Sequence, residues 1–178
     1  MDFEQMALTR QSTRNFSDKE VEYEKLTKIC EVAALSPSAC NSQPWKLHII
    51  TKNYEKVDDL RKTLQIVGLN KFLNNVTNYI VVEQVYGNKS ATLGSTFSKN
   101  DLNSIDLGIL TSYICFQAME EGLGTCIIGA FRKDKMQKAM NFKRNQVVRI
   151  VVAVGYPKEN DPIRKKIRKP LENTIVHH

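Results

Sequence analysis

The chain has 178 residues and little of what several classes of protein require. Its four cysteines form no C-x-x-C pair, and only His48 lies outside the C-terminal pair of histidines, so we expect no metal site. The longest apolar stretches, such as Ile150–Val154, are far shorter than the roughly 20 residues of a membrane-spanning helix. The acidic start of the chain has no apolar signal core. We therefore expect a cytoplasmic protein with reduced cysteines and no membrane partner.

The excess of positive charge lies mostly in one short segment. Basic residues number 26 against 19 acidic ones, a net charge of +7, and residues 163–170 hold five of the basic residues. Without that segment, 21 basic residues face 19 acidic ones. A local cluster suits a small anion such as a phosphate, or is a solvated tail, whereas a surface for duplex nucleic acid usually spreads its charge over a larger face. We therefore predict no nucleic-acid partner, and keep that function as an alternative.

Length and composition are those of one globular domain. Hydrophobic residues make up 42% of the chain and charged residues 25%, which excludes the disordered and fibrous classes. We treat residues 1–178 as a single domain, with residues 163–178 as a basic C-terminal extension. No internal repeat or low-complexity tract divides it.

Hydrophobic periodicity predicts an α+β fold with a small sheet wrapped by helices. Helices are predicted over residues 2–9, from Ser17–Glu20 or a turn later to Ala34, and over 54–65, 104–121 and 133–140. Strands are predicted over residues 46–51, 79–83, 125–128 and 147–154, the last of them central and buried on both faces. The polar residues 87–103 indicate a mobile loop.

Two basic segments are candidates for binding an anion. Arg10-Gln-Ser-Thr-Arg14 places two guanidiniums and two hydroxyls at the end of a predicted helix, and such forked donors fit a phosphate. The alternative is a solvated helix end. Lys165–Pro170 is either a solvated surface or a clamp on the same anion.

Ser36-Pro-Ser-Ala-Cys-Asn-Ser-Gln-Pro-Trp45 is too polar and too constrained for a plain connector. Its two prolines fix the backbone, and its three serines, Asn41 and Gln43 supply donors and acceptors without bulk. It is either a ligand-binding segment or a structural turn held by Trp45.

The segment Gly122–Phe131 contains three glycines that do not follow the dinucleotide pattern G-x-G-x-x-G, and it follows a helix, so a Rossmann site is excluded. It is either a helix cap and a core strand, or backbone that approaches a flat ligand closely at Gly129 and Ala130. Cys40 beside His48 would be a conceivable cysteine hydrolase, but nothing in the sequence positions the pair.

Taken together, these segments resemble the FMN-dependent nitroreductase family. Five blocks carry the match in the family's order and span residues 10–171: Arg10–Arg14, Ser36–Trp45, Gly122–Phe131, Gly155–Pro157 and Lys166–Leu171. The P-S-x-x-N-x-Q-P-W block is fairly specific by itself. The resemblance implies an α+β sandwich with a mostly antiparallel sheet, in an intertwined homodimer with two FMN sites at the subunit interface.

The resemblance also implies which residues hold the cofactor. Those implied to bind the phosphate and ribityl groups are Arg10, Gln11, Ser12, Arg14, Lys166 and Arg168. Those implied to reach the flavin from the partner chain are Pro37, Ser38, Ala39, Asn41 and Gln43. Those implied to lie against the isoalloxazine ring are Ile127, Ile128, Gly129 and Ala130, with a backbone N–H near Gly129 meeting N5. Asn70 or Lys71 is a loose match for a group at the pyrimidine edge.

The function implied is an oxidoreductase of ping-pong type. NADH or NADPH gives a hydride to FMN, and a flat acceptor such as a nitroaromatic or a quinone then takes its place. No side chain is assigned as an acid or a base. Two alternatives stay open: a flavin enzyme of the same fold with another reaction, such as dehalogenation, flavin fragmentation or azoline oxidation, and a non-enzymatic flavin- or nucleic-acid-binding protein.

Overall fold

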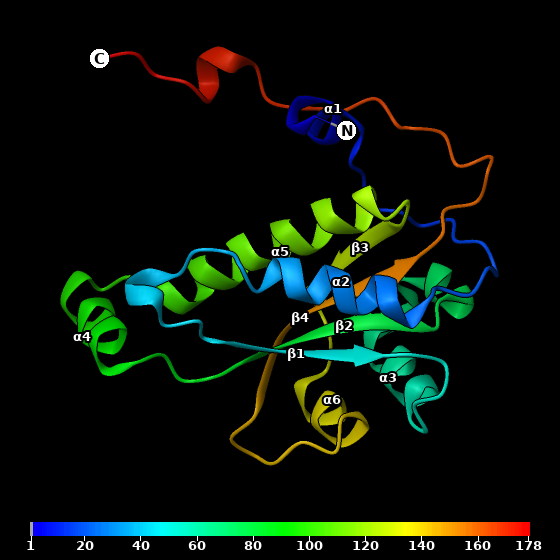
Figure 1. Cartoon of the computed structure of the whole chain (residues 1–178), viewed down its shortest axis with the longest axis horizontal. Coiled ribbons are helices and arrows are strands. Elements are labelled where there is room, and N and C mark those ends of the chain that lie inside the picture. Colours follow the sequence, from blue (N-terminus) through cyan, green and yellow to red (C-terminus); the bar gives the residue numbers. More distant parts are fainter. Residues whose placement is uncertain (1) are drawn as a thin grey trace.

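A four-stranded antiparallel sheet forms the centre of the molecule (Figure 1). The structure is a computed structural model that describes residues 2–178, so Met1 of the predicted domain lies outside the described residues. In spatial order the strands are β1 (Trp45–Ile50), β2 (Asn78–Gln84), β4 (Val147–Gly155) and β3 (Gly124–Ile128). Every neighbouring pair is antiparallel. The prediction that the last strand is central is confirmed, and it is fully buried from Val151 onward.

Helices cover both faces of this sheet. Within residues 2–178 they are α1 (Phe3–Thr9), α2 (Tyr23–Ala33), α3 (Val57–Leu64), α4 (Lys89–Ser98), α5 (Leu102–Glu120) and α6 (Lys133–Ala139). Short 3-10 turns are η1 (Ala39–Asn41), η2 (Ile66–Gly68), η3 (Lys71–Asn75) and η4 (Leu171–Asn173). α2 and α5 pack on one face, and α3 and α6 on the other (Figure 1). The predicted α+β sandwich is therefore confirmed.

Alternation along the central strands creates the two cores. Successive side chains of a strand point to opposite faces, so Ile80 packs with α2 and α5 whereas Val81 packs with α3 and α6. Leu26 and Leu110 close the first core and are fully buried. Each core therefore depends on the apolar faces of two helices meeting every second residue of a strand.

The prediction of a loop over residues 87–103 is wrong, because α4 occupies ten of those residues. Asn88 caps this helix by accepting a hydrogen bond from the backbone N–H of Ala91 at 2.9 Å. Ala91 is its one buried residue. A polar helix with a single buried side chain gives almost no periodic signal, which explains the error.

The start of α2 also differs from the capping signal in the sequence. The helix begins at Tyr23, and the carboxylate of Glu20 pairs with Lys52 at 2.7 Å instead of closing a capping box. The end of α5 follows its signal, since Gly122 adopts a left-handed φ of 74° there.

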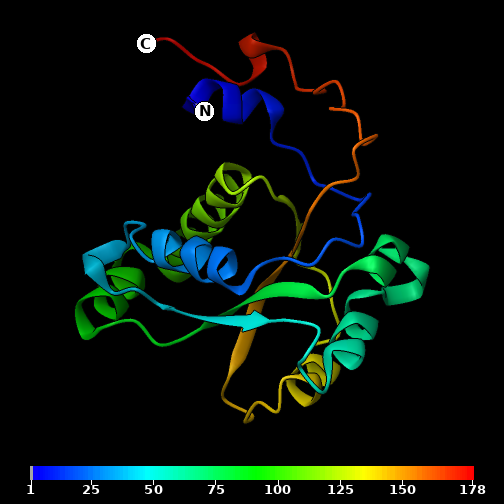
Figure 2. The same cartoon turned by 45° about the vertical axis from the view of Figure 1, so that its right-hand side comes forward.

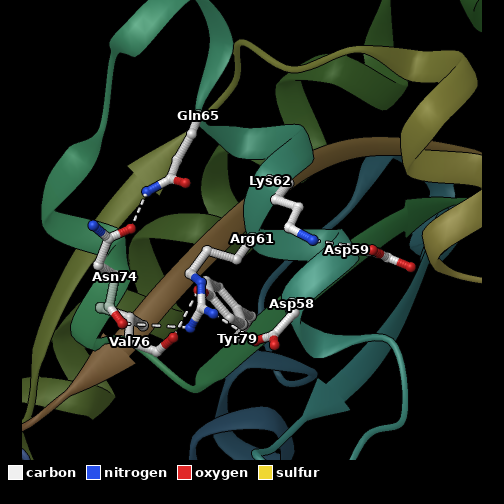
Figure 3. A network of polar contacts seen from close by, with 8 residues as sticks. All are labelled: Asp58, Asp59, Arg61, Lys62, Gln65, Asn74, Val76 and Tyr79. Atoms are coloured by element: carbon white, nitrogen blue, oxygen red, sulfur yellow. Dashed lines mark hydrogen bonds and ion pairs between the residues drawn. The ribbon is translucent and has the colours of Figure 1, made fainter.

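α3 is tied to the turn that precedes β2 (Figure 3). The side-chain amide of Gln65 donates to Oδ1 of Asn74 at 2.8 Å. The amide of Asn70 donates to the carbonyl of Leu64 at 2.9 Å. Of the two loose matches for a flavin contact, Asn70 therefore serves the turn itself, and Lys71 is exposed.

α1 and the C-terminal segment project together beyond α5 (Figures 1 and 2). α1 buries none of its residues, and Phe3 is 67% exposed although its ring lies 5.2 Å from that of Phe116. Leu171 and Val176 of the C-terminal segment are also exposed. The apolar side chains of both segments are thus largely uncovered in the single chain.

Gly124 allows residues 10–14 to lie directly against β3. A β-carbon at this position would lie 2.4 Å from Oγ1 of Thr13. We expect Gly124→Ala to lower the free energy of unfolding by about 1–3 kcal/mol, through overpacking. Thermal denaturation followed by circular dichroism measures the change.

Gly94→Ala is the matched control for this prediction. A β-carbon at position 94 would meet Leu102 at an ordinary 3.7 Å, so alanine should stabilise α4 by roughly 0.5–1 kcal/mol. Equal melting temperatures for Gly124→Ala and the unsubstituted protein would contradict the close packing of Thr13 on β3.

Candidate functional site

Residues 10–14 run along the outer edge of β3 and are held there by backbone contacts. The N–H of Thr13 donates to the carbonyl of Thr125 at 2.8 Å, and Ser12 forms a parallel bridge with Thr125. β4 occupies the other edge of β3. This arrangement delivers the side chains of the Arg10–Arg14 block to one end of the sheet.

The C-terminal extension returns across this same segment (Figures 1 and 2). The backbone N–H of Arg164 donates to Oε1 of Gln11 at 3.0 Å, and its guanidinium donates to the carbonyl of Ser12 at 2.6 Å. The ammonium of Lys166 donates to the carbonyl of Arg10. The two basic segments, separated by some 150 positions of sequence, are therefore in contact.

Three guanidiniums gather around one buried residue of β3, Cys126. Burial raises the pKa of its thiol, and the positive charges of Arg14, Arg10 and Arg164 oppose the rise. Arg10 is also anchored, because its guanidinium donates to Sγ of Cys115 at 3.5 Å. The cations thus share one small region above the strand.

The cluster has more positive charge than the protein neutralises. Asp161, with its side chain 6% exposed, pairs with Arg164 at 3.6 Å. Arg14 is exposed and makes no hydrogen bond or ion pair with any residue from 2 to 178. Charge-assisted hydrogen bonds to an oxyanion are the interactions that such free guanidiniums make best. The arrangement fits a phosphate.

The C-terminal end of β3 is open. Ile128 belongs to the core, whereas Ile127 is 40% exposed and Gly129 and Ala130 are exposed. A β-carbon at Gly129 would meet no atom within 4 Å. Small residues on an open strand end leave the backbone accessible, and its contact with a flat ligand stays a prediction.

The segment Pro37–Gln43 is strained and tightly bonded. Cys40, Asn41 and Gln43 have φ values of 51°, 49° and 46°, in the left-handed region that few side chains favour. The amide of Gln43 donates to Oδ1 of Asn41 at 3.0 Å, and Oγ of Ser38 accepts from the N–H of Gln43 at 2.9 Å. The segment is therefore a preformed surface rather than a slack connector.

A single chain does not bring this segment to the cations. Asp106, near the start of α5, accepts the N–H of Ala39 at 3.1 Å. Cys115, which contacts Arg10, lies nine residues further on, or about 13 Å along the helix axis. Figure 1 shows the same separation, with the end of α2 beside α4 and β3 at the opposite end of α5. The two surfaces therefore lie apart within one chain.

The structure places the predicted phosphate residues unequally. Arg10, Ser12, Arg14 and Lys166 lie together beside β3. The amide of Gln11 is engaged by the extension, donating to the carbonyl of Pro162 at 3.2 Å and accepting from Arg164. The guanidinium of Arg168 donates to the adjacent carbonyl of Ile167 at 2.8 Å. The cofactor roles of all these residues stay predictions.

Arg164 is the member of the cluster that the sequence did not single out. The signal available was the density of basic residues in 163–170, and that density does not say which of them turns inward. Arg164 turns inward because its guanidinium donates to the carbonyl of Ser12 and its backbone N–H donates to the side chain of Gln11. Such contacts between distant segments have no local sequence pattern.

Other kinds of site were also sought. Among residues 2–178, no group of three His, Cys, Asp or Glu side chains is placed to hold a metal ion. Over the same residues, no helix has the length and apolar character needed to cross a membrane.

A layered α+β domain with a basic cluster beside an edge strand has the features of a protein that binds a phosphate-bearing ligand. The chain is a member of the nitroreductase family, because the model described as "Nitroreductase family" matches residues 7–72 and 67–156. The chain is 30% identical over 158 residues to an Archaeoglobus fulgidus protein provisionally named an NADH dehydrogenase/NAD(P)H nitroreductase, covering 86% of this chain and 84% of that one. It is 26% identical to an iodotyrosine deiodinase of Hydra vulgaris, over 94% and 69% of the two chains. An FMN-dependent nitroreductase structure from Clostridium difficile superposes with a TM-score of 0.71 at 28% identity, covering 95% of this chain and 94% of that one.

Proposed function

We propose that the protein is an FMN-dependent NAD(P)H oxidoreductase that reduces a flat electron acceptor such as a nitroaromatic or a quinone. The observation that carries the proposal is the meeting of Arg10, Arg14 and Lys166 beside β3, where Arg14 has no hydrogen bond or ion pair with residues 2–178. A dianionic phosphate would neutralise this charge. Family membership supplies the reaction class.

The chain's own residues bind and orient the cofactor. The guanidiniums of Arg10 and Arg14 and the ammonium of Lys166 would hold the phosphate, and the backbone at Gly129 would face the ring. When bound, FMN supplies hydride and electron transfer between a reduced nicotinamide and the acceptor. No side chain is needed as a proton donor.

We propose further that the active form is a homodimer, in which Pro37–Gln43 of one subunit completes the flavin site of the other. The separation of this segment from the cations within one chain supports that arrangement. An apolar hollow of about 460 Å³, lined by residues such as Phe3, Met6 and Phe116, is the kind of surface that a second copy would cover. Sedimentation equilibrium would give twice the mass of the chain, and a monomer that binds FMN tightly would contradict the shared site.

The visible absorbance spectrum of the purified protein tests the cofactor and the activity. The proposal expects a yellow protein that bleaches under anaerobic NADH or NADPH and releases FMN on denaturation. A colourless protein that also fails to take up added FMN would exclude the function. In that case, salt-sensitive binding to nucleic acid is the next measurement.

Reductive dehalogenation is the second candidate, because the relatives of this chain include iodotyrosine deiodinases. The two reactions share the fold and the cofactor and differ in the acceptor. Assays of the reduced protein with a nitroaromatic, a quinone and an iodinated tyrosine separate them. Release of iodide faster than oxidation by the other two acceptors would establish the second candidate.

A further inference from the structure

Arg164 has more hydrogen-bond donors than it uses. A guanidinium carries five N–H groups, and that of Arg164 gives one to the carbonyl of Ser12 at 2.6 Å. Its distance of 3.6 Å to the carboxylate of Asp161 is that of a loose ion pair, too long for a hydrogen bond. Most N–H groups of the Arg164 guanidinium are therefore available to a ligand.

The position of Arg164 is fixed from two sides. Its backbone N–H donates to Gln11 at 3.0 Å, and the amide of Gln11 in turn donates to the carbonyl of Pro162 at 3.2 Å. The reciprocal bonds of Gln11 hold residues 162–164 against the loop that carries Ser12. A guanidinium held in this way loses less conformational entropy on binding than one on a free tail.

Arg164 also lies where the other cations converge. With Arg10 and Arg14, it is one of three guanidiniums whose charge reaches the thiol of Cys126. Among residues 2–178, the side chain of Arg168, in the same basic run, hydrogen-bonds to the carbonyl of the adjacent Ile167 and to no more distant segment. The C-terminal extension thus presents Arg164 to the anion site by its own contacts.

We propose that Arg164 is a specificity-determining residue of the flavin site: its guanidinium binds the terminal phosphate and so selects FMN over riboflavin. The inference rests on the proposed function. Riboflavin has the same ring and ribityl chain but no phosphate, so it makes no use of a cation at this place. Loss of Arg164 therefore changes the ratio of the two affinities, whereas loss of a merely structural contact changes both together.

The test is a titration of the full-length protein with FMN and with riboflavin, after removal of co-purified flavin, followed by quenching of flavin fluorescence. For Arg164→Ala we expect the Kd for FMN to rise about 10- to 100-fold, with the Kd for riboflavin nearly unchanged. Arg164→Lys keeps the positive charge but loses the planar guanidinium. Its Kd for FMN should therefore lie between those of the unsubstituted protein and Arg164→Ala. Arg144→Ala is the matched control, because this exposed arginine carries the same charge and lies in the turn before β4, away from the basic cluster.

The outcomes separate the inference from the proposed function. If both Arg164 variants keep the wild-type ratio of affinities, or weaken both flavins equally, Arg164 does not bind the phosphate. The same holds if Arg144→Ala changes the ratio as much, because the net charge of the protein would then explain the effect. Should Arg164→Ala fail to fold, as judged by circular dichroism, Arg164→Lys decides alone. An unsubstituted protein that binds neither flavin would instead overturn the proposed function.

Discussion

Arg14→Ala is expected to weaken FMN binding by about 10- to 100-fold while leaving the stability of the chain unchanged. Arg14 is exposed and has no hydrogen bond or ion pair within residues 2–178, so its removal breaks no internal contact. What is lost is a charge-assisted hydrogen bond to the phosphate. Retention is measured as flavin content per chain after gel filtration, affinity as the Kd for FMN, and stability as the melting temperature.

Arg144→Ala is the control for the loss of one positive charge. Arg144 is an exposed arginine in the turn before β4, away from the cluster. It should retain FMN as the unsubstituted protein does. Unchanged flavin content and affinity in Arg14→Ala would show that the phosphate does not bind at this place, and the role of the whole Arg10–Arg14 block would fall with it.

The sheet could be predicted because its signal is local. In β2 and β4, alternate residues enter two different cores, so these strands are apolar almost throughout, as the run Ile150–Val154 is. α5 was predicted for the same kind of reason, since an apolar face and Gly122 mark its length and its end. α4 was missed because it rests on one buried alanine. A helix that is stabilised by one small tertiary contact shows little hydrophobic periodicity in its sequence.

The candidate site was predictable in its segments and not in its geometry. The motifs named the Arg10–Arg14 block, and the structure places its cations beside β3 with Lys166. The choice between Arg164 and Arg168 depends on how the extension crosses Ser12, and no spacing rule encodes that path. The separation of Pro37–Gln43 from the cluster likewise follows from the length of α5. Charge density and motif order identify the parts of such a site, and only the packing of distant segments assembles them.

Gly129→Val should reduce turnover with a reduced nicotinamide and an acceptor by about 100-fold or more, because small displacements at a reacting centre cost that much. A β-carbon at this position meets no atom within 4 Å, so the substitution does not disturb the core. The added methyl groups would instead occupy the space through which the flavin ring reaches the backbone of β3. Steady-state rates, the flavin spectrum and the melting temperature are measured on the same preparation.

Gly129→Ala is the graded control, with a smaller side chain at the same place and a smaller expected loss. Both variants keep Arg14 and the other cations, so the phosphate should still hold FMN partly, and the loss should appear in the spectrum and the rate more than in flavin content. This pattern is the reverse of that expected for Arg14→Ala, in which retention falls first. A valine variant with a normal flavin spectrum and normal turnover would place the ring elsewhere. Two separate defects, one at each end of the cofactor, would establish that FMN spans from the basic cluster to the open end of β3.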